Sequence, residues 1–448
     1  MDPSALPVPR RSRLLPRLLD LTWSYAPRTV REAGDAIVRN FLLHGFPHKV
    51  ARRSLALSYS LWLGTASAVL FLLLAVTGGI LMFLYVPSVE RAYGSIQDLE
   101  SVVSYGAFLR ASHRIGAHAM VLVVVLHLMR VFLTGAYKNG VLVRQHRHFN
   151  WWIGLALLLL TLLLSFTGYL LPWDQLAYWA ITVGTNIANA VPLVGQEVRL
   201  LLLGGHEINQ STLLRFYVLH CFALPVATAG LVAWHLWRVR KDGGLACRDQ
   251  LALQQRSQEA PPAPGKTYAL LGIAPGTTPQ VETALVDEDE HLVETVPALN
   301  RRVLLTLLAT LAVVGLLAVA LGAPLEEPAN PQITPNPAKA PWYFLWLQEL
   351  VTDTTLRLGG FTLNGALVGG ILVPGLLALL GLAVPFLDRS PPEAVGVWGH
   401  RSRRGVNAVF VAVCLALVVL TVVGTLLRGP YWNFYWPWES WPTTPPRF

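Results

Sequence analysis

Residues 110–130 read RASHRIGAHAMVLVVVLHLMR, an apolar run with arginines near its ends and two histidines, His113 and His127. On an α-helix of about 100° per residue, a spacing of fourteen residues points both imidazoles to nearly the same side, roughly 21 Å apart along the axis. A second apolar stretch, residues 215–240, carries His220 and His235 fifteen residues apart, about 60° out of alignment. Two helices with such pairs can hold two planar metal centres stacked along their length.

The composition is that of an integral membrane protein. The 448 residues are 53% hydrophobic and 14% charged, whereas soluble domains carry about 25% charged residues. Seven stretches are long and uncharged enough to span about 30 Å of hydrocarbon. They centre on residues 60–85, 113–134, 151–171, 215–238, 303–322, 364–387 and 405–426. The expected fold is therefore all-α with seven transmembrane helices: a four-helix dihaem bundle and a three-helix C-terminal part.

The distribution of charge predicts the orientation in the membrane. The first 53 residues hold ten Lys or Arg against four Asp or Glu, which places the N-terminus in the cytoplasm by the positive-inside rule. The net charge of +9 thus reflects membrane topology, and no nucleic-acid partner is expected. The N-terminus is polar and proline-rich and lacks the apolar core of a cleaved signal peptide. The three cysteines show neither CxxC nor CxxCH spacing, so no disulfide framework or c-type haem attachment is indicated.

The apolar runs and the charges along the sequence divide the chain into five segments. They are a cytoplasmic basic surface segment (1–53), the four-helix dihaem domain (54–240), a cytoplasmic linker rich in Gln, Pro, Gly and acidic residues (241–300), a three-helix domain with an outer loop (301–427), and an outer aromatic tail (428–448).

The four membrane histidines are the candidate metal ligands. Intramembrane ionisable residues are costly and rarely idle, and neutral imidazole is a good axial ligand for haem iron. Antiparallel helices would pair His113 with His220 on the outer side and His127 with His235 on the inner side. Two arginines flank these positions, Arg110 and Arg130, where they either neutralise haem propionates or extend toward the membrane surface. A further histidine, His118, lies about 140° from His113 around the helix, which indicates a structural or hydrogen-bonding role.

Two glycine pairs repeat the histidine spacing. Gly64 and Gly78 in the first span, and Gly154 and Gly168 in the third, are again fourteen residues apart. Glycine in a membrane helix commonly permits close helix packing. Because the same spacing occurs in three helices, we favour a different role for these four glycines: each leaves the backbone without a side chain and so makes room for a macrocycle.

The chain resembles cytochrome b of the cytochrome bc-type quinol oxidoreductases over nearly its whole length. The resemblance rests on the histidine and glycine pairs, on LLPWDQLAYWA (170–180), on PWYFLWLQEL (341–350) and on PFLD (385–388). The fifteen-residue histidine gap, the PWDQ sequence and the seven spans are similar to the photosynthetic and Gram-positive branch, in which the protein is split in two. Here the two parts are fused through the 241–300 linker.

The resemblance implies the membrane core subunit of a proton-translocating quinol–cytochrome c oxidoreductase with two non-covalent, bis-histidine b-type haems. Quinol would be oxidised at the outer side, near residues 168–182 and around Pro341, Trp342 and Tyr343. One electron would pass to a Rieske iron–sulfur protein and one through the haems to an inner quinone site near Arg240. The implied partners are that Rieske protein, a c-type cytochrome and lipid, in a homodimeric complex of a bacterial inner membrane.

Two departures from the family pattern matter. The outer loop reads Ala340, Pro341, Trp342, Tyr343, where the family has Pro-Glu-Trp-Tyr, so the acid thought to accept a quinol proton is absent. General-base catalysis at neutral pH still needs a nearby acceptor, and Glu349 and Asp353 are the candidates, although Glu349 could equally be a surface acid. The split branch also attaches an extra haem through a cysteine of the first span. Trp62 stands there, so no covalent haem is expected.

Two other classes of protein remain as alternatives. The dihaem anchor subunit of a formate dehydrogenase or hydrogenase also binds haem between helices, but usually has fewer spans and no need of the Pro-Trp-Tyr loop. A transporter could use the histidines as a proton relay. A reduced-minus-oxidised optical spectrum separates the haem proteins from the transporter.

Overall fold

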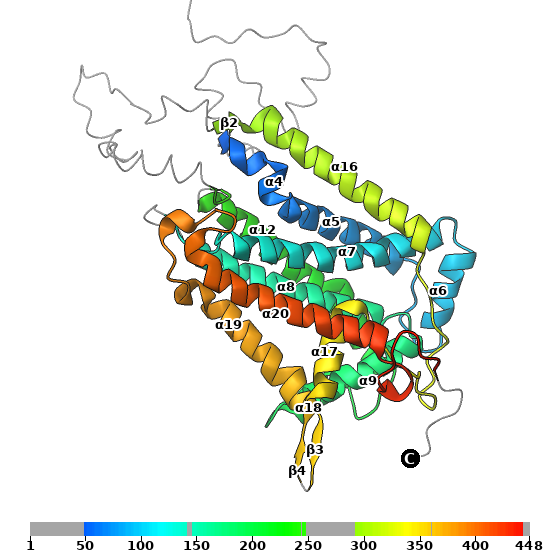
Figure 1. The fold of residues 1–448 in the computed structure, drawn as a ribbon. Coiled ribbons are helices and arrows are strands. Elements are labelled where there is room, and N and C mark those ends of the chain that lie inside the picture. Colours follow the sequence, from blue (N-terminus) through cyan, green and yellow to red (C-terminus); the bar gives the residue numbers. More distant parts are fainter. Residues whose placement is uncertain (1–48, 141–145, 243, 248–291, 360, 442–448) are drawn as a thin grey trace, which may run out of the picture.

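The computed structural model describes residues 49–140, 146–242, 244–247, 292–359 and 361–441 (Figure 1). Most of the predicted N-terminal segment and most of the predicted linker lie outside these residues. Seven helices of the described chain are long and apolar enough to cross a membrane, as predicted. A membrane interior offers no water to satisfy backbone groups, so such runs form helices that satisfy their own.

The first four spans form the predicted four-helix bundle. Helix α7 packs against α5 and α8, and α8 also packs against α12. The fourth span is continuous, but it is built from two α-helices joined by a π-helical turn, η2. The bounds are α5 Leu63–Met82, α7 Gly106–Leu133, α8 Arg147–Tyr169, α11 Gln210–Val218, η2 Leu219–Ala223 and α12 Leu224–Lys241.

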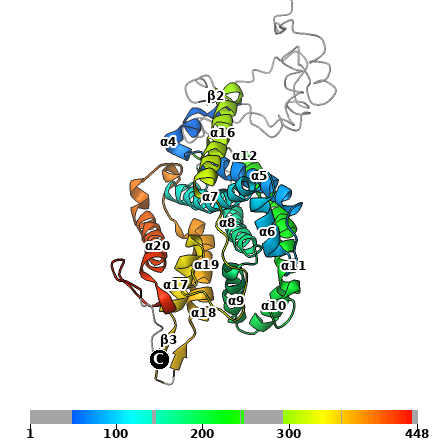
Figure 2. The same cartoon turned by 90° about the vertical axis from the view of Figure 1, so that its right-hand side faces the viewer.

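The two ends of the bundle differ in construction. At one end, here called the α6–α9 end, three short helices lie against the spans: α6 (Ala92–Ser101), α9 (Gln175–Asn189) and α10 (Gly195–Leu203) (Figures 1 and 2). Their apolar side chains form a buried cluster with the spans, in which Leu170 and Ile181 are fully enclosed. The other end, here called the α4 end, carries α4 (Leu57–Ser60) and the end of α12.

The last three spans do not form a bundle of their own. Helix α16 packs against α5 and α7, whereas α19 packs against α8. Figure 2 accordingly shows α16 apart from α19 and α20. A shorter helix, α17, lies between the bundle and α20. The bounds are α16 Thr295–Leu321, α17 Trp342–Asp353, α19 Val373–Leu387 and α20 Arg404–Val422. Helix α16 thus begins inside the segment predicted as linker.

Short elements complete the described chain. Two antiparallel strand pairs are the only departures from helix among its regular elements: β1 (Lys49–Ala51) with β2 (Leu292–Glu294), and β3 (Leu356–Leu358) with β4 (Phe361–Leu363). The all-α prediction is otherwise confirmed. The remaining short helices are η1 Arg52–Leu55, α18 Gly365–Leu367, η3 Val368–Leu372, η4 Pro392–Ala394, η5 Arg401–Arg403, η6 Val423–Leu427 and η7 Pro430–Trp432.

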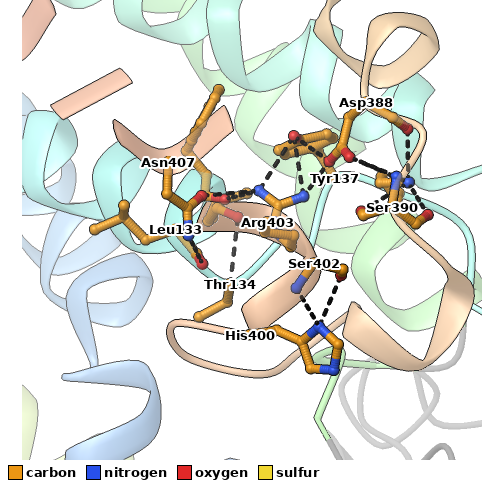
Figure 3. Close-up of polar contacts among 12 residues, drawn as sticks. Leu133, Thr134, Tyr137, Asp388, Ser390, His400, Ser402, Arg403 and Asn407 are labelled. Atoms are coloured by element: carbon orange, nitrogen blue, oxygen red, sulfur yellow. Dashed lines mark hydrogen bonds and ion pairs between the residues drawn. The ribbon is translucent and has the colours of Figure 1, made fainter. Parts of the chain in front are cut away.

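A buried ion pair joins the N-terminal bundle to the C-terminal helices at the α4 end (Figure 3). Arg403, at the start of α20, pairs with Asp388, which follows α19, and both side chains are fully enclosed. Tyr137, just past α7, donates to Asp388 Oδ2 over 2.7 Å. Arg403 Nη2 also donates to the Phe132 carbonyl over 2.6 Å, and Lys138 Nζ donates to the Asp388 carbonyl over 2.7 Å. We call these residues the Asp388 clasp.

The clasp keeps its carboxylate ionised. Burial alone would raise the pKa of Asp388, but hydrogen bonds from Ser390 and Tyr137 and the charge of Arg403 outweigh burial and lower the pKa to about 2. A buried charge is tolerated when it is paired and hydrogen-bonded, and here the partners Arg403 and Tyr137 come from the start of α20 and from the segment after α7. The clasp therefore fixes the connection between α19 and α20 against the end of α7.

Candidate functional site

The structure brings the four predicted histidines together in two pairs. The ring centroids of His113 and His220 are 6.3 Å apart, and those of His127 and His235 are 6.5 Å apart, with the rings nearly perpendicular in both pairs. Two metal–imidazole bonds of about 2 Å each, plus about 1.2 Å from nitrogen to ring centre, would separate the centroids by about 6 Å. Each pair is therefore spaced to hold one metal ion between its rings.

The two histidines of a pair would leave most of the coordination sphere of that ion open. No group of three or more His, Cys, Asp or Glu side chains in the described chain could hold a metal ion. The remaining ligands of such an ion must come from a molecule bound with it, and a planar macrocycle that leaves two axial positions meets this condition.

Each predicted glycine faces one of these histidines. A Cβ atom built on Gly168 would lie 2.5 Å from Cε1 of His220, and one on Gly78 would lie 3.1 Å from Cε1 of His113. At the α4 end the corresponding distances are 3.1 Å from Gly64 to His127 and 3.7 Å from Gly154 to His235. The glycines thus make room for the imidazole rings themselves, and the contact is closest at Gly168.

Threonines next to two of these glycines fix the proton position on the first pair. Thr77 Oγ1 donates to the Leu73 carbonyl over 2.7 Å and lies 2.8 Å from His113 Nδ1. Because its only proton is engaged, the hydroxyl must accept from Nδ1–H. Thr167 repeats the arrangement, with its oxygen 3.2 Å from His220 Nδ1. Both rings then carry their lone pair on Nε2, the form that binds a metal.

The π-turn explains how the fifteen-residue spacing is accommodated. His220 lies within η2, whose bonds run from residue i to i+5 and so take up one extra residue in a single turn. The remaining path to His235 is regular α-helix. The misalignment of about 60° expected from regular helix is therefore removed, and both rings meet their partners on α7.

The predicted quinol-site residues lie at two places along α17. Tyr343 is buried toward the bundle, where its ring lies 5.5 Å from that of His118. Burial raises the pKa of Tyr343 to about 12, although the charge of Arg114 opposes the shift. Trp342 donates from Nε1 to His118 Nδ1 over 3.0 Å. The hydrogen-bonding role expected for His118 is thus present in the structure.

Glu349 lies two turns further along α17 and does not contact this group. Arg428 Nε donates to both of its carboxylate oxygens, over 2.8 and 3.0 Å. The residue is 1% exposed, so it is not a surface acid. Asp353 is about half exposed beside the same arginine, and its pKa is raised by burial and by the charge of Glu349. A role for Glu349 as acceptor of a quinol proton stays a prediction, and in the structure its carboxylate is bound by Arg428.

Two family models match the chain. The first, described as Cytochrome b/b6/petB, matches residues 49–243, and the second, described as Cytochrome b(C-terminal)/b6/petD, matches residues 328–436. Cytochrome b6 of Heliobacterium modesticaldum is 38% identical over 196 residues, which are 44% of this chain and 88% of that protein. Cytochrome b6 of Auxenochlorella protothecoides is 41% identical over 173 residues, which are 39% of this chain and 78% of that protein.

The chain belongs to the cytochrome b/b6 family. A solved chain described as a hyperthermophilic respiratory Complex III has the same fold, with a TM-score of 0.63 and 24% identity, over 84% of this chain and 86% of that one. Membership makes this cytochrome b a transmembrane electron-transport protein that binds b-type haem and serves in a quinol oxidoreductase.

The predicted arginines of this cytochrome b have different surroundings. Arg110 forms an ion pair with Glu100 and donates to the carbonyls of Ala323 and Pro324, so its guanidinium already has partners. Arg130 is 3% exposed, lies 4.5 Å over the Tyr59 ring, and has one nitrogen, Nη2, without a hydrogen-bond partner. An unpartnered, buried guanidinium nitrogen is suited to an anionic group such as a propionate.

Other predicted positions lie at the α4 end. Arg240 is half-buried in the last turn of α12, with no side-chain hydrogen bond or ion pair to another described residue. Its neighbour Arg238 is buried instead and binds Asp242 over 2.8 Å. Trp62 stands just before Gly64 at the start of α5. The sequence reasoning did not anticipate Arg238 and Asp242, although an arginine and an aspartate four residues apart at a helix end are a usable signal.

Proposed function

We propose that this cytochrome b oxidises quinol at the α6–α9 end and reduces quinone at the α4 end, as the membrane core of a proton-translocating quinol–cytochrome c oxidoreductase. The observation that carries the proposal is that the four histidines form two pairs within one helix bundle. The ring centroids are 6.3 Å apart in one pair and 6.5 Å apart in the other. Two one-electron centres stacked across a membrane suit transfer from one side to the other.

Different side chains would hold the two non-covalent b-type haems. His113 and His220 would ligate one, and His127 and His235 the other, while Arg130 Nη2 is available to a propionate at the α4 end. When bound, the haems supply one-electron carriers with no open coordination position, which suits electron transfer rather than oxygen chemistry. The glycines keep the backbone clear of the rings, and Thr77 and Thr167 hold two of the imidazoles in the metal-binding tautomer.

The chain also supplies a site for quinol at the α6–α9 end. Tyr343, Trp342 and His118 lie together there, next to the aromatic rings of Phe344 and Tyr169. Aromatic walls with a few polar groups are typical of sites for planar apolar ligands. With a phenol pKa of about 12, Tyr343 stays protonated near neutral pH and can donate a hydrogen bond to quinol oxygen. At the other end, Arg240 is assigned to the quinone-reduction site.

The orientation and partners complete the proposal. The basic N-terminal segment is placed in the cytoplasm of a bacterial cell, so the α6–α9 end faces outward. Quinol oxidation there releases protons outside. One electron of each quinol goes to a Rieske iron–sulfur protein and onward to a c-type cytochrome, within a dimeric complex.

Optical spectra and quinol turnover of the purified complex test the proposal. Wild type is expected to show b-haem absorbance and to reduce cytochrome c with quinol. His113→Ala and His127→Ala should each lose about half of the absorbance, because each removes one axial ligand of one haem. His206→Ala, in the exposed loop between α10 and α11, is the matched control and should retain all of it. Full absorbance in both membrane variants would contradict the ligand assignment, and full absorbance without quinol oxidation would contradict the reaction.

A further inference from the structure

Quinol oxidation releases two protons, and the carboxylates nearest to Trp342 and Tyr343 along the chain and in space already have partners. Residues 328–348 contain neither Asp nor Glu. Asp174 accepts from the backbone N–H groups of Ala177 and Glu326 over 2.9 and 3.3 Å. Glu349 is buried against Arg428 two turns further along α17, and Asp353 lies beside the same arginine. Tyr343 is protonated at neutral pH because burial raises its pKa to about 12. A different base must therefore be sought among the groups that face this site.

His118 is the basic group that meets both residues of the site. It lies on α7, five residues after His113 and on another face of the helix. Its Nδ1 accepts from the Trp342 indole over 3.0 Å, and its ring packs edge-to-face on Tyr343 at 5.5 Å. Because Nδ1 is the acceptor, the neutral ring carries its proton on Nε2, and Nδ1 is the nitrogen that can take a second one.

The bond to Trp342 can be exchanged for a bond to substrate. Trp342 is 39% exposed, so its indole is not locked in place by packing. A quinol hydroxyl donates through its O–H, so it can take the position of the indole N–H on Nδ1. The lone pair of His118 would then be directed at the proton that quinol must lose.

Few other charges act on His118. Arg114, one turn earlier on the same helix, faces it and donates to the Pro324 carbonyl over 2.8 Å. Tyr343 faces it from α17, and Tyr169 of α8 lies behind Tyr343. Residues 63–82 of α5 and 303–321 of α16 contain no titratable side chain, and Glu100 of α6 is bound to Arg110.

We infer that His118 is the proton acceptor for quinol oxidation in this chain, in the place that a carboxylate takes in its relatives. In the step, a quinol O–H bond breaks, its electron pair stays on oxygen, and an Nδ1–H bond forms on His118. The two electrons leave the quinol singly, to the iron–sulfur partner and the b-type haem of the proposed function, on which this inference rests. The imidazolium then releases its proton to the outer solvent.

Variants of His118 separate this role from a purely structural one. His118→Asn keeps an oxygen that can accept from the Trp342 indole but cannot take a proton at neutral pH. His118→Asp restores a titratable base, and His206→Asn is the exposed control. The measurement is the rate at which quinol reduces the b-type haem in the intact complex between pH 5.5 and 9, with reduced-minus-oxidised spectra to verify haem content.

The expected results follow from the loss of a general base, which contributes about 10²–10⁴-fold to a rate. His118→Asn should be slower by about 100-fold or more with full haem absorbance. His118→Asp should recover at least about tenfold of that loss, with the rising limb of its pH profile moved to lower pH because a carboxylate ionises lower. His206→Asn should match wild type.

Three outcomes would overturn the inference. A His118→Asn complex with the wild-type rate and pH profile shows that His118 takes no proton. Equal slowing in the Asn and Asp variants, with haem intact, shows that the imidazole acts only through its shape. A wild-type complex that carries haem but does not oxidise quinol removes the proposed function and this inference with it, whereas an active wild type with an unaffected Asn variant removes the inference alone.

Discussion

The two histidine pairs share one spacing but differ in what surrounds them. At the α6–α9 end, Thr77 and Thr167 precede the glycines and hydrogen-bond to His113 and His220. At the α4 end, leucine and isoleucine precede Gly64 and Gly154, and Nδ1 of His127 has no hydrogen-bond partner. The glycine repeat therefore sets where the rings lie, while the preceding residue decides whether a side chain orients them.

The contacts around the two ends also differ. The α4 end has buried ion pairs, Arg403 with Asp388 and Arg238 with Asp242. The α6–α9 end has the Arg110–Glu100 ion pair, but it also has a large apolar cluster and loop carbonyls that bind Arg110 and Arg114. That end therefore combines oriented histidines and apolar packing with the aromatic walls of the proposed quinol site.

The largest expected difference between the pairs comes from adding one methyl group. In Gly168→Ala the new Cβ would lie 2.5 Å from Cε1 of His220, whereas in Gly154→Ala it would lie 3.7 Å from Cε1 of His235, an ordinary contact. We expect Gly168→Ala to lose about half of the b-haem absorbance, because overpacking displaces the ring. Gly154→Ala is the matched control with the smaller loss. Equal losses would show that the tight contact at Gly168 has no consequence.

Removing the charge of Asp388 should destabilise the α4 end. Asp388→Asn leaves Arg403 buried without its partner, which typically costs about 3–5 kcal/mol. The measurement is the temperature at which the purified complex loses haem absorbance. Ser390→Ala is the control, because it removes a hydrogen bond of about 1 kcal/mol and leaves the ion pair. If Asp388→Asn is as stable as Ser390→Ala, the Asp388 clasp does not hold the two halves of the chain together.

A smaller effect should separate the two haems in their potentials. Thr77→Val removes the acceptor of His113 Nδ1–H, which lowers the basicity of the ligand. Partners of this kind typically change metal affinity by about 10-fold or more, and we expect the potential of the haem at the α6–α9 end to rise. Thr161→Val is the control, because Thr161 is buried on α8 and bonds only to its own helix. Redox titration measures both, and identical potentials in the two variants would contradict the role of Thr77.

The smallest expected effect is the pH dependence of the clasp. The folded pKa of Asp388 is about 2, below its ordinary value of 3.8. Its contribution to stability is therefore complete above about pH 4 and is lost as the pH falls through about 2. The difference in melting temperature between wild type and Asp388→Asn should stay constant from pH 5 to 8. A difference that shrinks across that range would show that the carboxylate titrates there and is not held as described.

The sequence predicted the spans and the histidine partners because both depend on simple periodicities. Long apolar runs give helices in lipid, and a repeat of fourteen residues fixes rings on one side of a helix. It could not place the π-turn at His220, because the fifteen-residue gap to His235 indicates an extra residue but not where along the helix it is inserted. Nor could it place α16 on α5 and α7, because lipid-facing and helix-facing apolar residues are chemically alike.

The partners of the α17 residues also depend on tertiary packing. Glu349 was a reasonable candidate acceptor from its distance along the chain, but Arg428, almost eighty residues later, binds it. His118 received a hydrogen-bonding role from its helical angle, yet its partner is Trp342, more than two hundred residues away. Contacts between the two halves of the chain carry no local signal in one sequence.

The separate docking of α16 has a consequence for how such a protein can be encoded. Helix α16 lies on α5 and α7 and α19 lies on α8, whereas α20 packs mainly on α17. The four histidines lie on α7 and on the fourth span, so the C-terminal helices contribute none of the candidate metal ligands. The cytochrome b6 of Heliobacterium modesticaldum matches this chain over 88% of its own length but only 44% of this one. A gene boundary between α12 and α16 would thus leave all four histidines in one polypeptide.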